Sequence, residues 1–136
     1  MAITEESRLV WLKALRKLGD ATATPVETFP GIVIVSSYFA MRNAAIAVLL
    51  ATDGKAPSGD SAIVTSFGVA VGKAGYLHGE AFNRAFDLRN VEDYDAVASP
   101  TPKEAAASRS DAEALLRYCA ERFGFVIEPP GENAAR

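Results

Sequence analysis

The sequence predicts an all-α fold, an up-and-down helical bundle of four to five helices. Apolar residues recur at helical spacing in five segments, short connections separate these segments, and none alternates like a half-buried strand. The chain has 136 residues, of which 49% are hydrophobic and 23% charged, which suits one soluble domain with a core. We expect this domain over residues 1–124 and a flexible tail over residues 125–136.

The first predicted helix runs from about Thr4 to Leu18 and is amphipathic. Gly19 is a reasonable stop, and a loop rich in threonine and proline follows over residues 21–30. The apolar stripe of this helix is predicted to consist of four leucines: Leu9, Leu12, Leu15 and Leu18.

A long apolar segment over Gly31–Thr52 forms the second predicted helix. The run at residues 32–35 has β-like character, but the alanine-rich continuation favours a helix, and Asp53-Gly54 ends it. Gly31–Ala51 has the length of a membrane span, yet Arg42 at its middle would cost roughly 3 kcal/mol in a bilayer. We therefore expect no membrane contact and a buried central helix, whose narrow polar seam is Tyr38, Arg42 and Asn43.

The third predicted helix begins at Ser58 or Asp60 and is weakened by glycines near its end. Asp60 is best explained as an N-cap or first-turn acid that favours the helix dipole. The fourth runs from Gly79 to about Val97. Its buried side is predicted to be Phe82, Ala85, Phe86, Leu88 and Val91.

The fifth predicted helix has the clearest local signal in the chain. Thr101 can cap its start, Pro102 suits the first helical position, and Glu104 completes a capping box. The helix continues through Phe123, and Gly124 closes it.

Composition excludes several classes of function. A net charge of −3 argues against a nucleic-acid coat, although a local basic pocket remains compatible with it. Cys119 is the only cysteine, and no cluster of cysteine and histidine has metal-ligand spacing, so we expect neither a disulfide, a metal nor a cofactor. Met1–Ser7 lacks the order of a secretion signal, so we expect a cytoplasmic protein.

Residues 86–95 concentrate charged and hydrogen-bonding side chains within one predicted helix. Arg89 and Asp93 lie four residues apart, as do Asn90 and Tyr94, so the two pairs share one side of the helix. This side is the candidate functional site.

Four groups of residues along the chain then carry a family resemblance. They are, in order, Ser37-Tyr38-Phe39-Ala40-Met41; Ala44-Ala45 with Leu49-Leu50; Ser61-Ala62-Ile63 with Phe67; and Arg89 followed by Asp93-Tyr94. Together they resemble the HEPN domain, and more narrowly its small stand-alone branch, the UPF0332-type proteins.

The resemblance implies a dimeric four- or five-helix bundle, often encoded beside a minimal nucleotidyltransferase in prokaryotic toxin-antitoxin pairs. Active members are metal-independent ribonucleases with an arginine, often an asparagine, and a histidine after four to six residues, brought together at the dimer interface. Arg89 and Asn90 match this motif, but the ends of the histidine window hold Tyr94 and Ala96. His78, the only histidine, precedes the motif helix.

Two further positions where this branch often has histidine hold Asn43 and Asp60. From the resemblance, the candidate catalytic residues are those of the motif, Arg89, Asn90 and Tyr94. The candidate binding residues are Arg42, Asn43 and Asp93.

RNA cleavage without a metal needs a base, an acid and a cation. Arg89 suits the cation, but a tyrosine that titrates near ~10 is a poor base, so cleavage is expected to be weak. The alternative for Arg89 is a purely structural role, in which an ion pair with Asp93 stabilises the helix by about 0.3 to 0.5 kcal/mol. Arg42 and Asn43 need partners in the fourth helix or across a dimer.

Three functions stay open at this point. The first is a homodimeric toxin-antitoxin or defence protein that binds RNA phosphate and cleaves RNA weakly. The second is a non-catalytic HEPN module that binds a nucleotide or a partner nucleotidyltransferase, with Tyr94 as a conceivable nucleotidylation site. The third is a helical interaction protein that only resembles HEPN.

Overall fold

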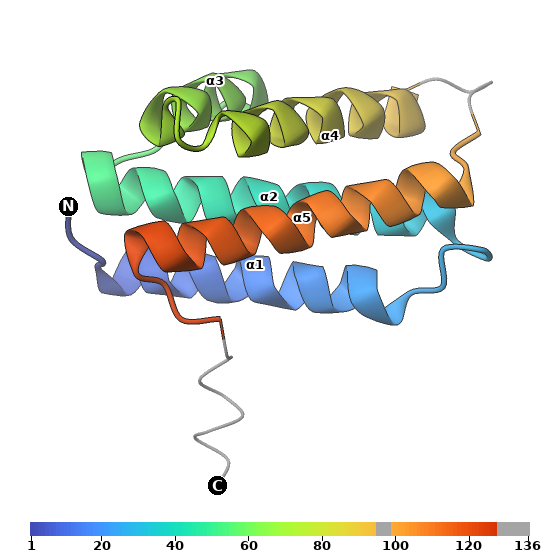
Figure 1. The fold of residues 1–136 in the computed structure, drawn as a ribbon, viewed down its shortest axis with the longest axis horizontal. Helices are drawn as coiled ribbons and strands as arrows, with labels where there is room; N and C mark the ends of the chain where they lie inside the picture. The colour runs from blue at the N-terminus through green and yellow to red at the C-terminus, as the bar shows by residue number, and fades with distance from the viewer. Residues whose placement is uncertain (95–98, 128–136) are drawn as a thin grey trace, which may run out of the picture.

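A computed structural model describes residues 1–94 and 99–127 of the chain, with the side chains of residues 1–91 and 99–127. This part forms five helices and contains no strand, which confirms the predicted all-α bundle (Figure 1). The helices are α1 (Glu5–Ala23), α2 (Pro30–Asp53), α3 (Asp60–Val71), α4 (Tyr76–Tyr94) and α5 (Pro102–Phe123).

Helix α2 is the centre of the bundle, because it contacts each of the other four helices. Figure 1 shows α3 and α4 on one side of α2 and α1 on the other side. Helix α5 packs mainly along α2 and also contacts α1 and α4. Helix α2 has the length and composition of a membrane span, yet 61% of its most apolar window is buried within the bundle. The predicted buried central helix is thus confirmed.

Helix α1 extends beyond the predicted stop at Gly19 and ends at Ala23. Gly19 lacks the positive φ that a glycine stop requires, so the helix passes through it. The predicted leucine stripe is right only in part, because Leu15 and Leu18 pack against the core whereas Leu9 is 47% exposed. The buried face of the helix also carries Trp11, which is 1% exposed.

The predicted ends of two helices, α2 at Gly54 and α5 at Gly124, are confirmed by backbone geometry. Gly54, Gly72 and Gly124 follow α2, α3 and α5 with φ angles of 77°, 60° and 84°, a region that only glycine adopts without strain. At the start of α5, the Thr101 hydroxyl accepts from the Glu104 amide at 3.1 Å, and the Glu104 carboxylate accepts from the Thr101 amide at 3.0 Å. This is the predicted capping box.

Helix α4 starts at Tyr76, three residues before the predicted Gly79, and its predicted end near Val97 lies outside the described residues. Gly79 lies inside the helix, where a β-carbon would be 3.5 Å from the Gly68 α-carbon of α3. That distance is an ordinary van der Waals contact, and it shows that the two helices lie side by side at these residues. Val91 is 44% exposed, so its predicted place on the buried side is wrong.

The predicted tail begins with two residues that pack on the bundle. Phe125 is only 6% exposed and stacks on Trp11, with ring centroids 4.7 Å apart. The Trp11 indole N–H donates to the Val126 carbonyl at 2.7 Å. The helical domain therefore extends past residue 124, and residues 128–136 lie outside the described part.

Candidate anion-binding site

Three helices bring a cluster of charged side chains together where the first turn of α3 meets α2 and α4. Arg42 comes from the middle of α2, Asp60 is the first residue of α3, and Arg89 lies near the described end of α4. The contacts of Asp60 with Arg89 and of Gly68 with Gly79 show that α3 and α4 run antiparallel. We call this group the Arg42–Asp60–Arg89 cluster.

The Asp60 carboxylate lies between the two guanidinium groups. Arg42 Nε donates to Asp60 Oδ1 at 2.8 Å, and Arg89 Nη1 lies 3.8 Å from Asp60 Oδ2. The three side chains are 25%, 28% and 18% exposed for Arg42, Asp60 and Arg89, so the cluster is neither fully buried nor fully solvated. These three side chains together carry a formal charge of +1.

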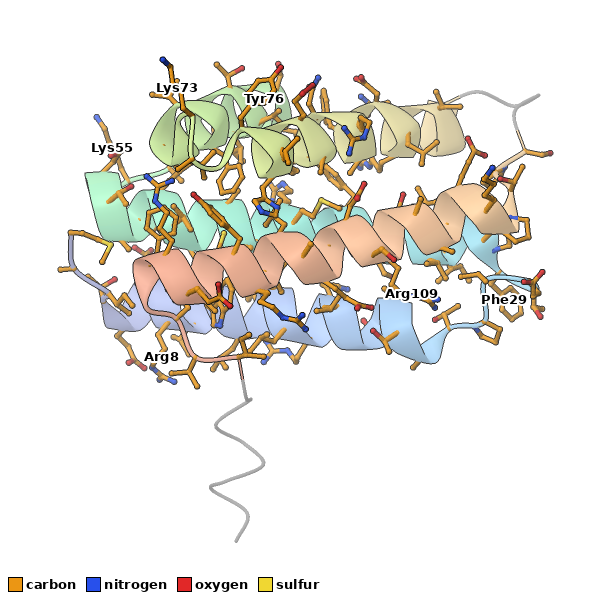
Figure 2. All side chains as sticks on the ribbon, in the orientation of Figure 1. Arg8, Phe29, Lys55, Lys73, Tyr76 and Arg109 are labelled. Atoms are coloured by element: carbon orange, nitrogen blue, oxygen red, sulfur yellow. The ribbon has the colours of Figure 1, made fainter. Side chains whose placement is uncertain are left out.

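Aromatic rings hold the Arg89 guanidinium in place. Its central carbon lies 5.5 Å from the ring centroid of Tyr38 and 5.6 Å from that of Phe39, both on α2. Such contacts favour a planar cation and restrict its rotation. Arg89 Nη1 also lies 3.5 Å from Asn90 Oδ1, at the outer limit of a hydrogen bond. In contrast, Lys55 and Lys73 are exposed and project from the bundle surface (Figure 2).

The protonation states of the cluster follow from its geometry. Burial alone would raise the pKa of Asp60, but the hydrogen bond and charge of Arg42, with the charge of Arg89, lower it below its ordinary value. Burial, and then the negative charge of Asp60, raise the pKa of Tyr38 well above its ordinary value. At neutral pH the cluster therefore contains an ionised Asp60 beside a protonated Tyr38.

The Tyr38 hydroxyl has an unusual environment. Tyr38 is 0% exposed, and its hydroxyl makes no hydrogen bond to the part of the chain that the structure describes. Asp60 contributes to the raised pKa of Tyr38, so this hydroxyl lies beside the carboxylate. A buried donor without a partner is costly, and such atoms are uncommon in folded proteins.

The structure brings together some of the predicted site residues. Arg42, Arg89 and Asn90 meet, whereas the Asn43 side chain donates to the Phe39 carbonyl of its own helix at 3.0 Å. Asn43 thus has a partner within its own helix, and a partner across a dimer stays a prediction. The side chains of Asp93 and Tyr94 lie outside the described residues, so their predicted roles stay predictions.

Sequence reasoning assigned Asp60 to the helix dipole and Tyr38 to a polar seam, but did not place either in the site. It also sought the partner of Arg42 in the fourth helix or across a dimer, whereas the partner is Asp60 of α3. The available signal was Arg42 itself, because an arginine in an apolar helix needs an anion nearby. An acid that opens the next helix fits that need.

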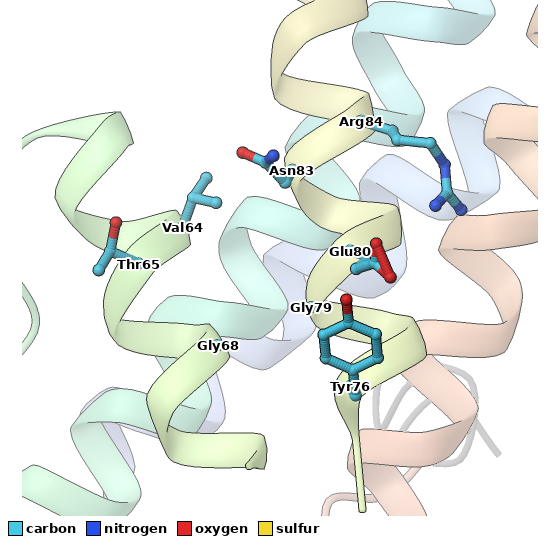
Figure 3. Close-up of a pocket in the computed structure, with 8 residues that line it drawn as sticks. All are labelled: Val64, Thr65, Gly68, Tyr76, Gly79, Glu80, Asn83 and Arg84. Atoms are coloured by element: carbon cyan, nitrogen blue, oxygen red, sulfur yellow. The ribbon is translucent and has the colours of Figure 1, made fainter. Parts of the chain in front are cut away.

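A hollow between α3 and α4, apart from the cluster, has a volume of about 440 Å³ (Figure 3). Its charged residues oppose each other: Glu80 is negative, and Arg84 pairs with Asp111 of α5 at 3.4 Å. The hollow thus lacks the positive excess of the Arg42–Asp60–Arg89 cluster. The lining residues are Val64, Thr65, Gly68, Tyr76, Gly79, Glu80, Asn83 and Arg84.

Within the described ranges, no group of three cysteine, histidine or acidic side chains is placed to hold a metal ion. The cluster can instead bind an anion, since guanidinium groups and a hydroxyl are donors that phosphate oxygens accept from. Comparisons with protein-family models, with curated proteins and with solved structures find no match to this chain.

Proposed function

We propose that this chain is a HEPN-like protein, acting as a cytoplasmic homodimer, that binds RNA through its phosphates at the Arg42–Asp60–Arg89 cluster. One observation carries the proposal: Arg89 of the motif helix and Arg42 of the central helix converge on the same partly exposed position. We further propose a role in a prokaryotic toxin-antitoxin or defence system, in keeping with the motif around Arg89.

The cluster has the chemistry that phosphate binding requires. A guanidinium offers a planar fork of donors that matches two phosphate oxygens, and it keeps its charge at all physiological pH values. The rings of Tyr38 and Phe39 reduce the freedom of Arg89, so less conformational entropy is lost when a phosphate binds. RNA binding by such a site weakens as salt rises, because phosphate contacts release counterions.

The same cluster supports weak cleavage at most. Asp60 is a poor base because its pKa is lowered, and Tyr38 is a poor acid or base because its pKa is raised. Neither replaces a histidine near neutral pH, and the loss of one acid-base group typically costs about 10² to 10⁴ in rate. Tyr94 is the remaining proposed participant in cleavage.

These protonation states favour a second candidate function, a non-catalytic module that binds a nucleotide or a minimal nucleotidyltransferase. This function needs the cation cluster but no base. It predicts a stable complex with the product of a neighbouring nucleotidyltransferase gene, measured by co-purification of the two proteins. Cleavage of RNA that depends on Arg89 would favour the ribonuclease-like function instead.

The test is RNA binding by fluorescence anisotropy, with a labelled single-stranded RNA of mixed sequence and several salt concentrations. We expect Arg89→Ala to weaken binding by about tenfold or more, the scale of one hydrogen bond between charged groups. Arg84→Ala is the matched control, because it removes an equal charge from the same helix while Arg84 pairs with α5. Equal binding by Arg89→Ala and wild type would contradict the proposal.

Two further measurements examine the rest of the proposal. Sedimentation velocity of the purified protein reports whether it is the expected homodimer, and a monomer at all concentrations would contradict this part. Incubation with RNA in the presence of a chelator reports cleavage that needs no metal. We expect slow cleavage or none in wild type, and no cleavage in Arg89→Ala.

A further inference from the structure

The two oxygens of the Asp60 carboxylate each face a different helix. Oδ1 accepts from Arg42 of α2, and Oδ2 lies beside Arg89 of α4. A phosphate bound at this cluster would use the same guanidinium donors, since it also presents oxygens to planar forks. Asp60 thus occupies, with a single negative charge, the position that a bound phosphate would take.

The Tyr38 hydroxyl is a third donor group beside the Asp60 carboxylate. The Tyr38 hydroxyl is fully buried and makes no hydrogen bond to the described residues, although it lies beside the carboxylate. A phosphate has more acceptor oxygens than a carboxylate, so it can accept from the hydroxyl as well as from both guanidinium groups.

We infer that Asp60 is an internal competitor of phosphate, which holds Arg42 and Arg89 in the absence of RNA and limits the affinity of the site. The inference rests on the proposed function, because it concerns the same cluster. In this account Asp60 sets the RNA affinity of the site, in addition to its role as the first residue of α3. RNA binds when a phosphate takes over donors from the carboxylate and gains the Tyr38 hydroxyl.

The competition is present at neutral pH, because Asp60 is ionised there. The carboxylate both occupies arginine donors and repels an approaching phosphate, and each effect weakens binding. Removing its charge while keeping its shape should therefore strengthen binding. Asp60→Asn does this, because asparagine has nearly the same shape and retains an oxygen acceptor for Arg42.

The experiment measures RNA affinity of Asp60→Asn by the same anisotropy assay over a salt series. We expect binding about tenfold tighter than wild type, the scale of one hydrogen bond to a charged group. The slope of log affinity against log salt should steepen by about 0.7 for each guanidinium that gains a phosphate. A role confined to holding the fold would not steepen this slope.

Asp111→Asn is the matched control. It removes the same charge from a carboxylate that also pairs with an arginine of α4, since Asp111 lies 3.4 Å from Arg84. Its affinity should change far less, and its salt slope should equal that of wild type. Equal gains in the two variants would overturn the inference, because net charge alone would explain them. Weaker binding by Asp60→Asn would overturn it too, because Asp60 would then support the arginines.

Wild-type protein provides a second measurement that does not depend on a variant. The nitrogen-proton signal of Arg42 Nε, observed by NMR, should shift when RNA saturates the protein, because its hydrogen bond to Asp60 is replaced. An unchanged signal at saturation would overturn the inference. Failure of the proposed function looks different, because RNA binding would then be insensitive to Arg89→Ala.

Discussion

Gly75 lies in the turn between α3 and α4, where the chain passes close to α5. A β-carbon at this position would be 2.5 Å from Val71 Cβ and 2.8 Å from the Tyr118 hydroxyl. Atoms at these distances overlap, so any side chain must displace the turn or the ring. The requirement for glycine here comes from packing, because Gly75 is not among the glycines with positive φ.

We expect Gly75→Ala to lower the free energy of unfolding by about 1 to 3 kcal/mol, the usual cost of overpacking. Gly19→Ala is the matched control, because Gly19 lies within α1 and a β-carbon there meets nothing within 4 Å. It should raise the free energy of unfolding by about 0.5 to 1 kcal/mol. Urea denaturation measures both changes, and equal effects would show that packing at Gly75 is looser than described.

His78 stacks on Tyr118 of α5, with ring centroids 4.5 Å apart. Burial lowers the pKa of His78, and the negative charge of Asp111 offsets part of that effect. The folded protein therefore favours neutral His78. Below the ordinary value of 6.5, the unfolded chain binds more protons than the folded protein does.

The free energy of unfolding should therefore decrease as pH falls through 6.5 toward the lower pKa of the folded protein. Urea denaturation between about pH 7.5 and about pH 5.5 covers the range in which a histidine titrates. His78→Phe keeps an aromatic ring against Tyr118 and removes the titration, so its stability should depend less on pH. An identical pH dependence in the variant would contradict this prediction.

At the scale of the element, the start of α5 is fixed by two reciprocal hydrogen bonds between Thr101 and Glu104. Thr101→Ala removes the hydroxyl and should lower the free energy of unfolding by about 1 kcal/mol. Thr65→Ala is a suitable comparison, because the Thr65 hydroxyl only donates to the Ser61 carbonyl within α3. Its effect should be within about 0.5 kcal/mol, as for other exposed positions. Urea denaturation distinguishes the two.

Local signals predicted the elements well, because capping and chain stops depend on a few neighbouring residues. Thr101 and Gly124 bound α5 as their chemistry requires, and Gly54 ends α2. Which face of a helix is buried depends on its neighbours in space. Leu9 and Val91 are exposed although the sequence pattern placed them inside.

The candidate site was also predictable only where it depends on local sequence. Arg42 and Arg89 were predicted from sequence, because charged residues in largely apolar or motif-bearing helices are conspicuous. Their convergence on Asp60 depends on the antiparallel packing of α3 and α4, which no local pattern encodes. Asn43 shows the limit of such reasoning, because its polar group is satisfied within its own helix.

At the scale of the whole molecule, the residues after α5 tie the last helix to the first. Phe125→Ala should lower the free energy of unfolding by about 3 kcal/mol or more, because the ring is buried against Trp11. Val126→Ala is the control, since its side chain is 65% exposed and its carbonyl still accepts from Trp11. Trp11 is the only tryptophan, so its fluorescence reports both transitions. A small effect of Phe125→Ala would contradict this account.

The central position of α2 has a consequence for how the molecule opens. Helix α2 packs against four neighbouring helices, whereas α4 packs against three and does so less extensively. The amide protons of α2 should therefore exchange with solvent mainly through global unfolding, while those of α4 also exchange when that helix alone detaches. Because Arg42 lies on α2 and Arg89 on α4, each such opening separates the two arginines. The lifetime of the closed α4 thus sets how long both cations are held together.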